Sequence, residues 1–199
     1  MKKLLALLLA LVMVLSLAAC NQPAEEPTEP TEPTEPTEPT EPTEPVAAPV
    51  YKLSMGVVVK IDSSKTGTAQ ADDTVAVVVT DADGKIVACE LDCAQTKVPM
   101  EGGVLGDLTA VDLRSKQEKK EDYNMVKFGG AIAEWMDQAT AYENYIVGMT
   151  IDEVNGMATE INEEGHTVVT DADPDLLAAC TMSIADFQAT LTKAVAQAR

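Results

Sequence analysis

Residues 50–199 carry short apolar runs separated by polar turns, a pattern that predicts strands and helices in one folded domain. Asp83-Gly84 is a strong signal for a tight hairpin turn, and it lies between two Val-rich runs. The polar stretch 63–70 predicts a loop before the first of these runs. Three strands are therefore expected in the first half of the domain: 51–61, 74–80 and 86–91.

Apolar residues in the middle of the domain repeat with the period of a helix. They occur at i, i+3, i+4, i+7 and i+10 and would share one helical face: Ile132, Trp135, Met136, Ala139 and Tyr142. Gly148 is expected to end this helix. The charged stretch 113–123 before it is also compatible with a helix.

Two further helices are predicted from the residues at their starts. Thr150 and Glu153 have the spacing of a capping box, and Gly156 would end the short helix that follows. Ser183 is expected to cap a last helix, and a short strand is expected at 166–170. Three apolar residues of the last helix would face inward: Phe187, Leu191 and Val195. The mixed order of strands and helices predicts an α+β class, with a hairpin-based antiparallel sheet packed against several helices.

The first twenty residues have the pattern of an export signal. A basic start precedes an apolar run of about twelve residues, which is too short to span a bilayer with ease. The run closes with Leu17-Ala18-Ala19-Cys20, which resembles the bacterial lipobox. The resemblance implies a signal peptide over 1–19 and a mature chain that begins at a lipidated Cys20, anchored at the outer face of the cell membrane. The alternative is an ordinary secretory signal with an incidental Cys.

Residues 20–49 have the composition of a linker. The triplet Glu-Pro-Thr repeats six times from Glu26 to Thr43. A Pro at every third position excludes helix and sheet and favours extended polyproline II. About 25 such residues would reach on the order of 80 Å. We therefore expect a disordered, charged tether between the membrane and the folded domain at 50–199.

The charge balance excludes one class of partner. The chain has 14 Lys+Arg and 33 Asp+Glu, and residues 50–199 hold 12 and 25 of them, a net charge of −13 for the domain. Nucleic-acid affinity depends on cations that meet phosphates, so no nucleic-acid partner is expected. A single His and four Cys also argue against a His-rich or multi-zinc site.

Candidate chemistry centres on Thr181, which precedes the last predicted helix. If Ser183 caps that helix, Thr181 lies within two residues of its N-terminus. Free backbone N–H groups and the helix dipole favour an anion such as a phosphate there. The small residues Ala178, Ala179 and Cys180 would let a bulky ligand approach the backbone.

The stretch 175–181 resembles the flavinylation motif of the FMN-binding domain family, in which an Asp is followed by small residues and a Thr. Other segments are similar to the family as well, and together they cover most of residues 74–195: 83–87, 119–125 and 147–154. The resemblance implies FMN as a covalent cofactor, joined through its phosphate to the Thr hydroxyl by a separate flavin transferase. It also implies a membrane electron donor and an extracellular acceptor as partners.

Carried over residue by residue, Asp175 matches the Asp of the motif and Thr181 its acceptor. Three residues differ from the usual pattern. Ala178 stands where Ser or Thr is common, Ala179 where Gly is common, and Cys180 where Ala is common. Because Ala is strained at positive φ, the conformation of Ala179 bears directly on this prediction.

Several aromatic and thioether side chains are candidate contacts for a flavin ring. Tyr123, Met125 and Phe128 lie next to a pair of glycines and would suit a ring pocket. Trp135 would also stack on a ring, but its place on the apolar stripe favours core packing.

The cysteines of the domain are expected to be free thiols. Cys89 and Cys93 are four residues apart in a predicted strand, a Cα separation of about 13 Å that excludes a disulfide between them. Pairing of either with Cys180 stays open, whereas free buried thiols are favoured.

The sequence thus predicts a lipid-anchored electron carrier with FMN on Thr181, and not an enzyme with a substrate pocket of its own. The alternative is a non-redox surface lipoprotein that keeps the fold and binds a ligand or partner.

Overall fold

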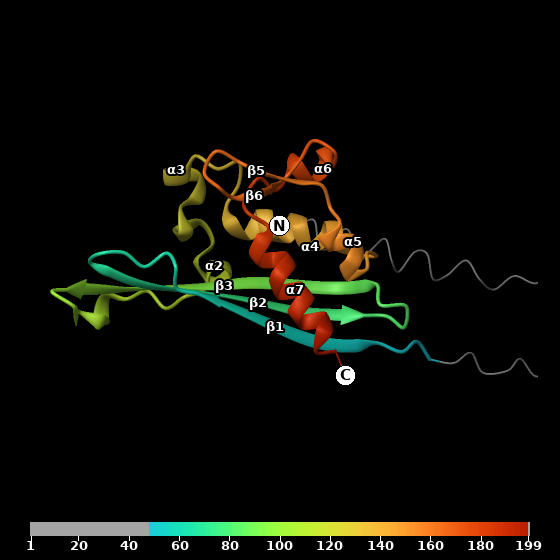
Figure 1. Ribbon diagram of the computed structural model, residues 1–199, viewed down its shortest axis with the longest axis horizontal. Helices are drawn as coiled ribbons and strands as arrows, with labels where there is room; N and C mark the ends of the chain where they lie inside the picture. The colour runs from blue at the N-terminus through green and yellow to red at the C-terminus, as the bar shows by residue number, and fades with distance from the viewer. Residues whose placement is uncertain (1–47, 199) are drawn as a thin grey trace, which may run out of the picture. The chain divides into compact units, whose positions relative to one another are not determined.

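Figure 1 shows the computed structural model of the chain, which describes residues 48–198. The chain divides into two units, Met1–Pro45 and Val46–Arg199, and every described residue belongs to the second. The predicted signal peptide, the lipidated Cys20 and the Glu-Pro-Thr repeats lie outside the described residues.

The domain is built on an antiparallel sheet whose strands follow chain order: β1 (Lys52–Lys60), β2 (Thr68–Thr80), β3 (Ile86–Glu101) and β4 (Val104–Leu105). The three strands predicted from the apolar runs are confirmed, and the turn with Asp83-Gly84 joins β2 to β3. Both of these strands are longer than predicted, because their pairing extends from Ile86 opposite Thr80 to Pro99 opposite Thr68. The end of the predicted loop at 63–70 therefore belongs to β2.

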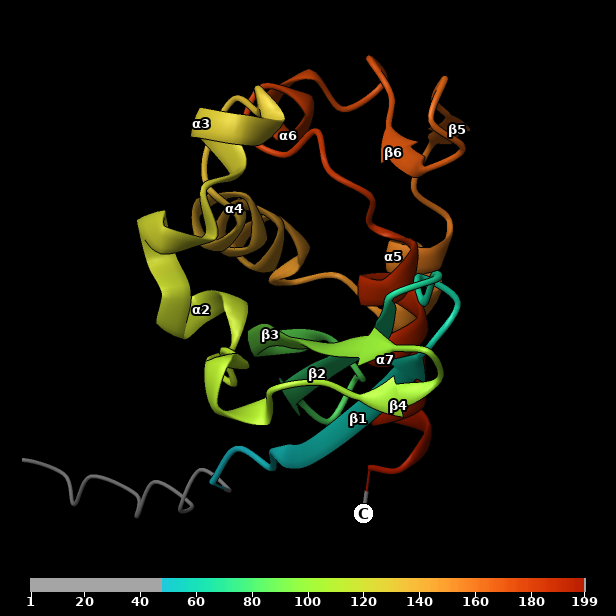
Figure 2. The same cartoon turned by 90° about the vertical axis from the view of Figure 1, so that its left-hand side faces the viewer.

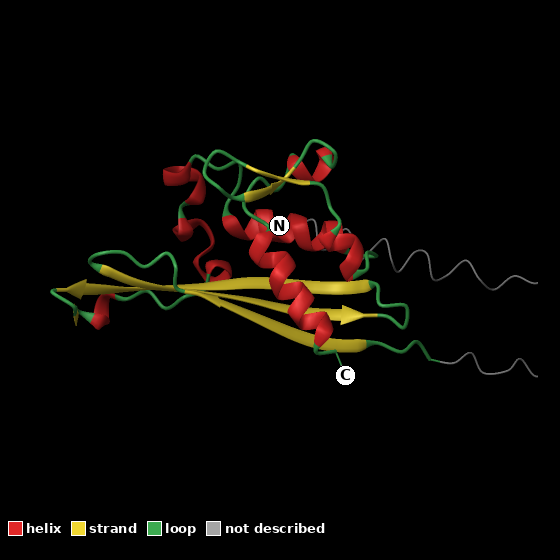
Figure 3. Cartoon of the chain, viewed as in Figure 1, coloured by secondary structure: helices red, strands yellow, loops and turns green. Residues whose placement is uncertain are grey.

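Within residues 48–198, six α-helices and a two-stranded sheet complete the domain: α2 (Lys116–Lys119), α3 (Met125–Gly129), α4 (Trp135–Ile146), α5 (Ile151–Asn155), β5 (Thr159–Ile161), β6 (Thr167–Val169), α6 (Pro174–Leu177) and α7 (Ala185–Ala196). Two 3-10 turns lie before and after α2: η1 (Leu108–Ala110) and η2 (Lys120–Tyr123). The charged stretch 113–123 thus forms only short pieces of helix. Figure 3 shows the long strands as one layer with helices packed beside it, which confirms the α+β class.

Helix α7 crosses β1 at backbone contact distance. A Cβ atom at Gly56 would lie 2.2 Å from the Thr190 carbonyl oxygen and 2.7 Å from the Ala194 nitrogen, so only glycine fits between strand and helix. The Lys193 ammonium then donates to the carbonyl of Val57 at 2.6 Å. This crossing fixes the position of α7 on the inner face of the sheet.

Helix α4 covers the same face over β3. It begins at Trp135, three residues after the first residue of the predicted apolar stripe. Ile132 lies before the helix and is exposed, so its place among the inward residues is wrong. Trp135, Ala139 and Tyr142 are buried as expected, and the buried face continues to Ile146. The ring of Phe187 in α7 packs against Trp135 with centroids 5.7 Å apart and against Tyr142 with centroids 5.4 Å apart. The core therefore lies between α4, α7 and the sheet.

The other local predictions have mixed outcomes. The capping box of Thr150 and Glu153 begins α5, and Gly156 ends it, both as expected. The strand expected at 166–170 is confirmed as β6. Ser183 is not the cap of α7, because Ile184 occupies that position and no side chain caps the helix. The Ile184 N–H instead donates to the carbonyl of Thr167, next to β6.

The outer face of the sheet carries exposed apolar side chains from β1 and β2: Leu53, Met55, Val59 and Val77. They alternate along each strand with inward residues such as Gly56 and Ala76, which are buried beneath the helices. None of the helices in residues 48–198 is long and apolar enough to cross a membrane.

Candidate functional site

A cavity of about 480 Å³ opens on the inner face of the sheet, beyond the packed core. Its floor includes Thr74 of β2 together with Cys93 and Gln95 of β3. In Figure 2 the α2–α3 arm lies on one side above the sheet and the β5–β6 hairpin on the other, and residues from both line the cavity. Met182 and Ser183, which follow Thr181 directly, also line the cavity, as do Asp62, Asp72 and Asp186. The cavity therefore reaches the residue after Thr181, but Thr181 and the other motif residues, 175–180, are not part of its lining.

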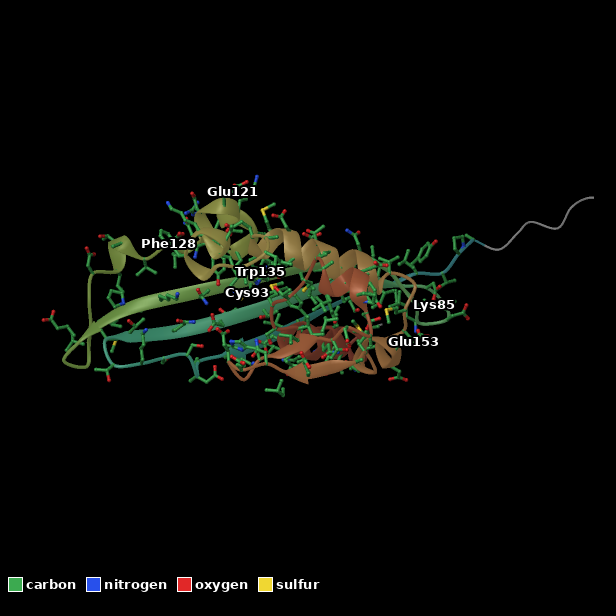
Figure 4. The ribbon with its side chains drawn as sticks, turned by 90° about the horizontal axis from the view of Figure 1, so that it is seen from above. Lys85, Cys93, Glu121, Phe128, Trp135 and Glu153 are labelled. Atoms are coloured by element: carbon green, nitrogen blue, oxygen red, sulfur yellow. The ribbon has the colours of Figure 1, made fainter. Side chains whose placement is uncertain are left out.

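One wall of the cavity is aromatic and thioether in character. Tyr123, Met125 and Trp135 all line it. Trp135 is only 4% exposed and meets Phe187 edge to face, so it belongs to the core and to the cavity wall at once. Figure 4 shows Trp135 next to Cys93 over the middle of the sheet, with Phe128 farther out. A wall of this kind suits a flat aromatic ligand.

The predicted ring contacts do not all meet at this cavity. Tyr123 and Met125 lie in its wall, and Trp135, which the sequence assigned to the core, joins them there. Phe128 is 76% exposed and is not part of the lining. Its ring lies under the ammonium of Lys127, with 5.0 Å to the ring centroid.

Gln138 of α4 holds the segment that contains Thr181, and sequence reasoning missed it. Its side chain is fully buried, and Oε1 accepts the backbone N–H of Thr181 at 2.9 Å and that of Met182 at 3.2 Å. Its Nε2 donates to the carbonyl of Ala133 at 2.8 Å. The only available signal was a Gln on the apolar stripe of the helix, three positions after Trp135 and four before Tyr142.

A second, only partly buried contact anchors the aromatic wall. The carboxylate of Glu134 accepts the backbone N–H of Met125 at 2.8 Å and that of Val126 at 3.2 Å. These two groups are free donors at the start of α3, so Glu134 satisfies them as a cap would. Glu134 and Gln138 together tie the two sides of the cavity to α4.

The motif residues run from α6 into the connection between α6 and α7. Asp175 lies in the first turn of α6 and is exposed, and Ala178 ends that helix. Outside glycine, the described residues with positive φ are Lys120 and Asn124, so Ala179 carries none of the strain that a left-handed conformation would impose.

Thr181 and Cys180 face opposite environments. Thr181 is exposed, with its hydroxyl 3.4 Å from Oε1 of Gln138. Cys180 is fully buried, and burial raises the pKa of its thiol to about 11. The attachment hydroxyl is thus accessible, whereas the thiol beside it is part of the core.

The start of α7 differs from the predicted anion site. Thr181 lies three residues before the N-cap Ile184, and the N–H groups of Thr181 and Met182 already donate to Gln138. Asp186 occupies the first turn of α7 and forms an ion pair with Lys60 of β1. Thr181 therefore lies farther from the start of α7 than predicted, and its own N–H donates to α4, whereas no side chain caps the first turn of α7.

The thiols are free, as predicted for Cys89, Cys93 and Cys180. Strand β3 is continuous through the first two. Burial raises the pKa of Cys89 to about 12, and it also raises the pKa of Cys93, an effect that the nearby Lys116 ammonium opposes. Among residues 48–198 no group of three or more His, Cys, Asp or Glu side chains is placed to hold a metal ion.

Comparison with known proteins leaves the site to be interpreted from its geometry. No protein-family model, no curated protein and no solved structure matches this chain.

Proposed function

We propose that this protein is a lipid-anchored, extracytoplasmic electron carrier that holds FMN covalently on Thr181. The observation that carries the proposal is the cavity of about 480 Å³ beside Thr181, with Tyr123, Met125 and Trp135 in its wall. Its size lies within the usual range of ligand pockets. The motif from Asp175 to Thr181 supports FMN as the ligand, and the lipobox supports the anchor at Cys20.

The aromatic wall of the cavity and the neighbouring segment with Thr181 support this group. Thr181 presents an exposed hydroxyl, and Ala179 adopts its conformation without left-handed strain. Bound FMN would supply one- and two-electron redox chemistry. Gln138 would hold the attachment segment in place, and the buried Trp135 would keep water from one side of the site.

The attachment requires a flavin transferase as a partner. The Thr181 oxygen would bond to the phosphorus of FMN, with the net loss of one water molecule. A chain held on a long tether would then carry electrons from a membrane donor to an outer acceptor. The domain charge of −13 would steer it toward cationic acceptors.

A second candidate function is a surface lipoprotein that binds a ligand or partner without redox chemistry. The observation that favours it is Asp186, whose carboxylate lines the cavity and occupies the first turn of α7. A carboxylate there weakens the attraction of a phosphate to this helix end. Its ion pair with Lys60 offsets part of that repulsion.

The test is the intact mass of the full chain after coexpression with a flavin transferase. We expect a mass gain of one FMN less water, and flavin fluorescence in a denaturing gel. Thr181→Ala should abolish both signals, whereas Thr140→Ala, at an exposed position of α4, should keep them. An unmodified wild-type chain, under conditions that flavinylate a member of the FMN-binding domain family, would overturn the carrier and leave the ligand-binding alternative.

A further inference from the structure

Among the described residues, two lysines line the cavity, and they differ in their partners. Lys60 forms an ion pair with Asp186. Lys116 has no carboxylate within 4.0 Å in residues 48–198. An ammonium without an acidic partner stands out in a domain with a net charge of −13. Asp62 and Asp72 also line the cavity but form no ion pair with Lys116, so its ammonium is available to a negatively charged ligand.

The Lys116 ammonium lies against the aromatic wall. It is 5.1 Å from the centroid of the Tyr123 ring and 5.3 Å from that of Trp135. Both distances are within the range of cation–π attraction. The same ammonium opposes the effect of burial on the pKa of Cys93 in the cavity floor. Lys116 therefore lies between the aromatic wall and Cys93 of the cavity floor.

The backbone around Lys116 is held firmly. Ser115 and Glu118 form a capping box that starts α2 one residue before Lys116. The Gln117 N–H donates to Asp92 at 3.2 Å, and its side chain donates to the carbonyl of Leu91 at 3.1 Å. These contacts tie α2 to β3, so the ammonium is positioned before any ligand arrives.

We propose that Lys116 is the positioning residue that selects a ligand ring able to carry negative charge, and that it favours the reduced form of that ring. The inference rests on the proposed function, because it assigns a role to Lys116 toward the isoalloxazine ring. Uptake of two electrons and one proton leaves that ring with one negative charge. The Lys116 ammonium attracts this charge, so it stabilises the reduced form more than the neutral oxidised form.

The experiment uses free riboflavin, which has the ring but no phosphate, and the full chain without flavin transferase. Titration by fluorescence quenching gives the affinity of the oxidised ring, and reduction with dithionite beside a reference dye gives the midpoint potential of the bound ring. We expect Lys116→Met to weaken riboflavin binding roughly tenfold and to lower the midpoint potential. If the variant also binds the reduced ring tenfold less tightly relative to the oxidised ring, the midpoint potential falls by about 30 mV for a two-electron couple.

Two variants make the result specific. Lys116→Arg keeps the positive charge and should restore the potential to near the wild-type value. Lys127→Met removes a lysine that also lies over an aromatic ring, that of the exposed Phe128, and it should change neither quantity. The midpoint potential of the bound ring distinguishes this role from a merely structural one. Lost packing alone would weaken the binding of the oxidised and the reduced ring alike and would leave the potential unchanged.

The outcomes separate the two proposals. If the wild-type chain binds riboflavin and Lys116→Met matches it in affinity and potential, the role of Lys116 is overturned while the flavin site stands. If the wild-type chain neither binds riboflavin nor becomes flavinylated, the proposed function itself fails. Similar unfolding temperatures for wild type and Lys116→Met would show that a loss of binding is not a loss of fold.

Discussion

The inner face of the sheet has two regions that differ in chemistry although the same strands run through both. Near the hairpin turn, Ala76, Val78 and Leu91 are fully buried beneath α4 and α7. Farther along β2 and β3, Thr74, Cys93 and Gln95 form the floor of the cavity. The first region is closed by direct helix-to-sheet packing, and the second is left open and polar. We infer that stability is concentrated in the packed region, and ligand binding in the open one.

The largest expected effect is a loss of stability in the packed region, at the close contact between Gly56 and α7. Gly56→Ala should cost on the order of 3 kcal/mol or more, because the added methyl group would meet backbone atoms of α7 that cannot move aside. Urea denaturation would measure the loss. Met55→Ala, at the neighbouring exposed position on the outer face, should change stability by less than about 0.5 kcal/mol. Equal losses in the two variants would contradict close packing at this point.

The next effect is a pH dependence in the same region. Glu143 is buried beside β3 and accepts the N–H of Leu91 at 2.6 Å, and burial raises its pKa to about 7 from an ordinary value of 4.5. Between these two pH values the folded chain binds more protons at this site than the unfolded chain. Stability from this group is therefore fully present below pH 4.5 and is lost as the pH rises to about 7.

The loss amounts to about 3 kcal/mol at most, at 1.36 kcal/mol per pH unit. Glu143→Gln keeps a neutral acceptor for Leu91 and should remove this dependence, leaving the variant more stable than wild type at pH 8. Thermal unfolding of both chains at pH 5 and pH 8 would measure the difference. A parallel pH response in the two chains would refute the assignment.

A third variant changes α4, the helix whose Trp135 belongs to both the packed region and the cavity wall. Gln138→Leu leaves the N–H groups of Thr181 and Met182 without their buried acceptor, at a cost of about 2 kcal/mol. It should also lower the flavinylated fraction, because the attachment segment loses its anchor. Intact mass and urea denaturation would report the two effects. Asn144→Ala, an exposed change on the same helix, should affect neither.

The smallest effect lies in the arm beside the cavity. Lys120 has φ 49° and ψ −126°, a conformation that suits glycine. Lys120→Gly should therefore raise stability by about 1 kcal/mol, in contrast to the losses expected in the packed region. Thermal unfolding would show a higher midpoint. A lower midpoint would mean that the long side chain of Lys120 contributes more than its backbone conformation costs.

Local signals predicted much of the fold. The Asp83-Gly84 turn, the Val-rich strands and the capping box at Thr150 depend on residues close together in the chain, and the structure confirms them. The signal at Ser183 failed because the Ile184 N–H finds an acceptor in Thr167, far away in sequence. The polar end of β3, including Gln95, was missed because pairing with β2 and not apolar character makes it a strand.

The candidate site likewise has parts that the sequence predicted and parts that it did not. The sequence by itself determined the α+β class, the motif around Thr181 and the absence of a Cys89–Cys93 disulfide, since these follow from patterns within short segments. Only the tertiary structure decided that Gln138 holds Thr181, that Trp135 faces both core and cavity, and that Lys116 has no acidic partner in the described part of the chain. Those facts depend on contacts between α2, α4, β3 and the segment before α7. Such contacts form only when elements distant in the chain pack on one face of the sheet.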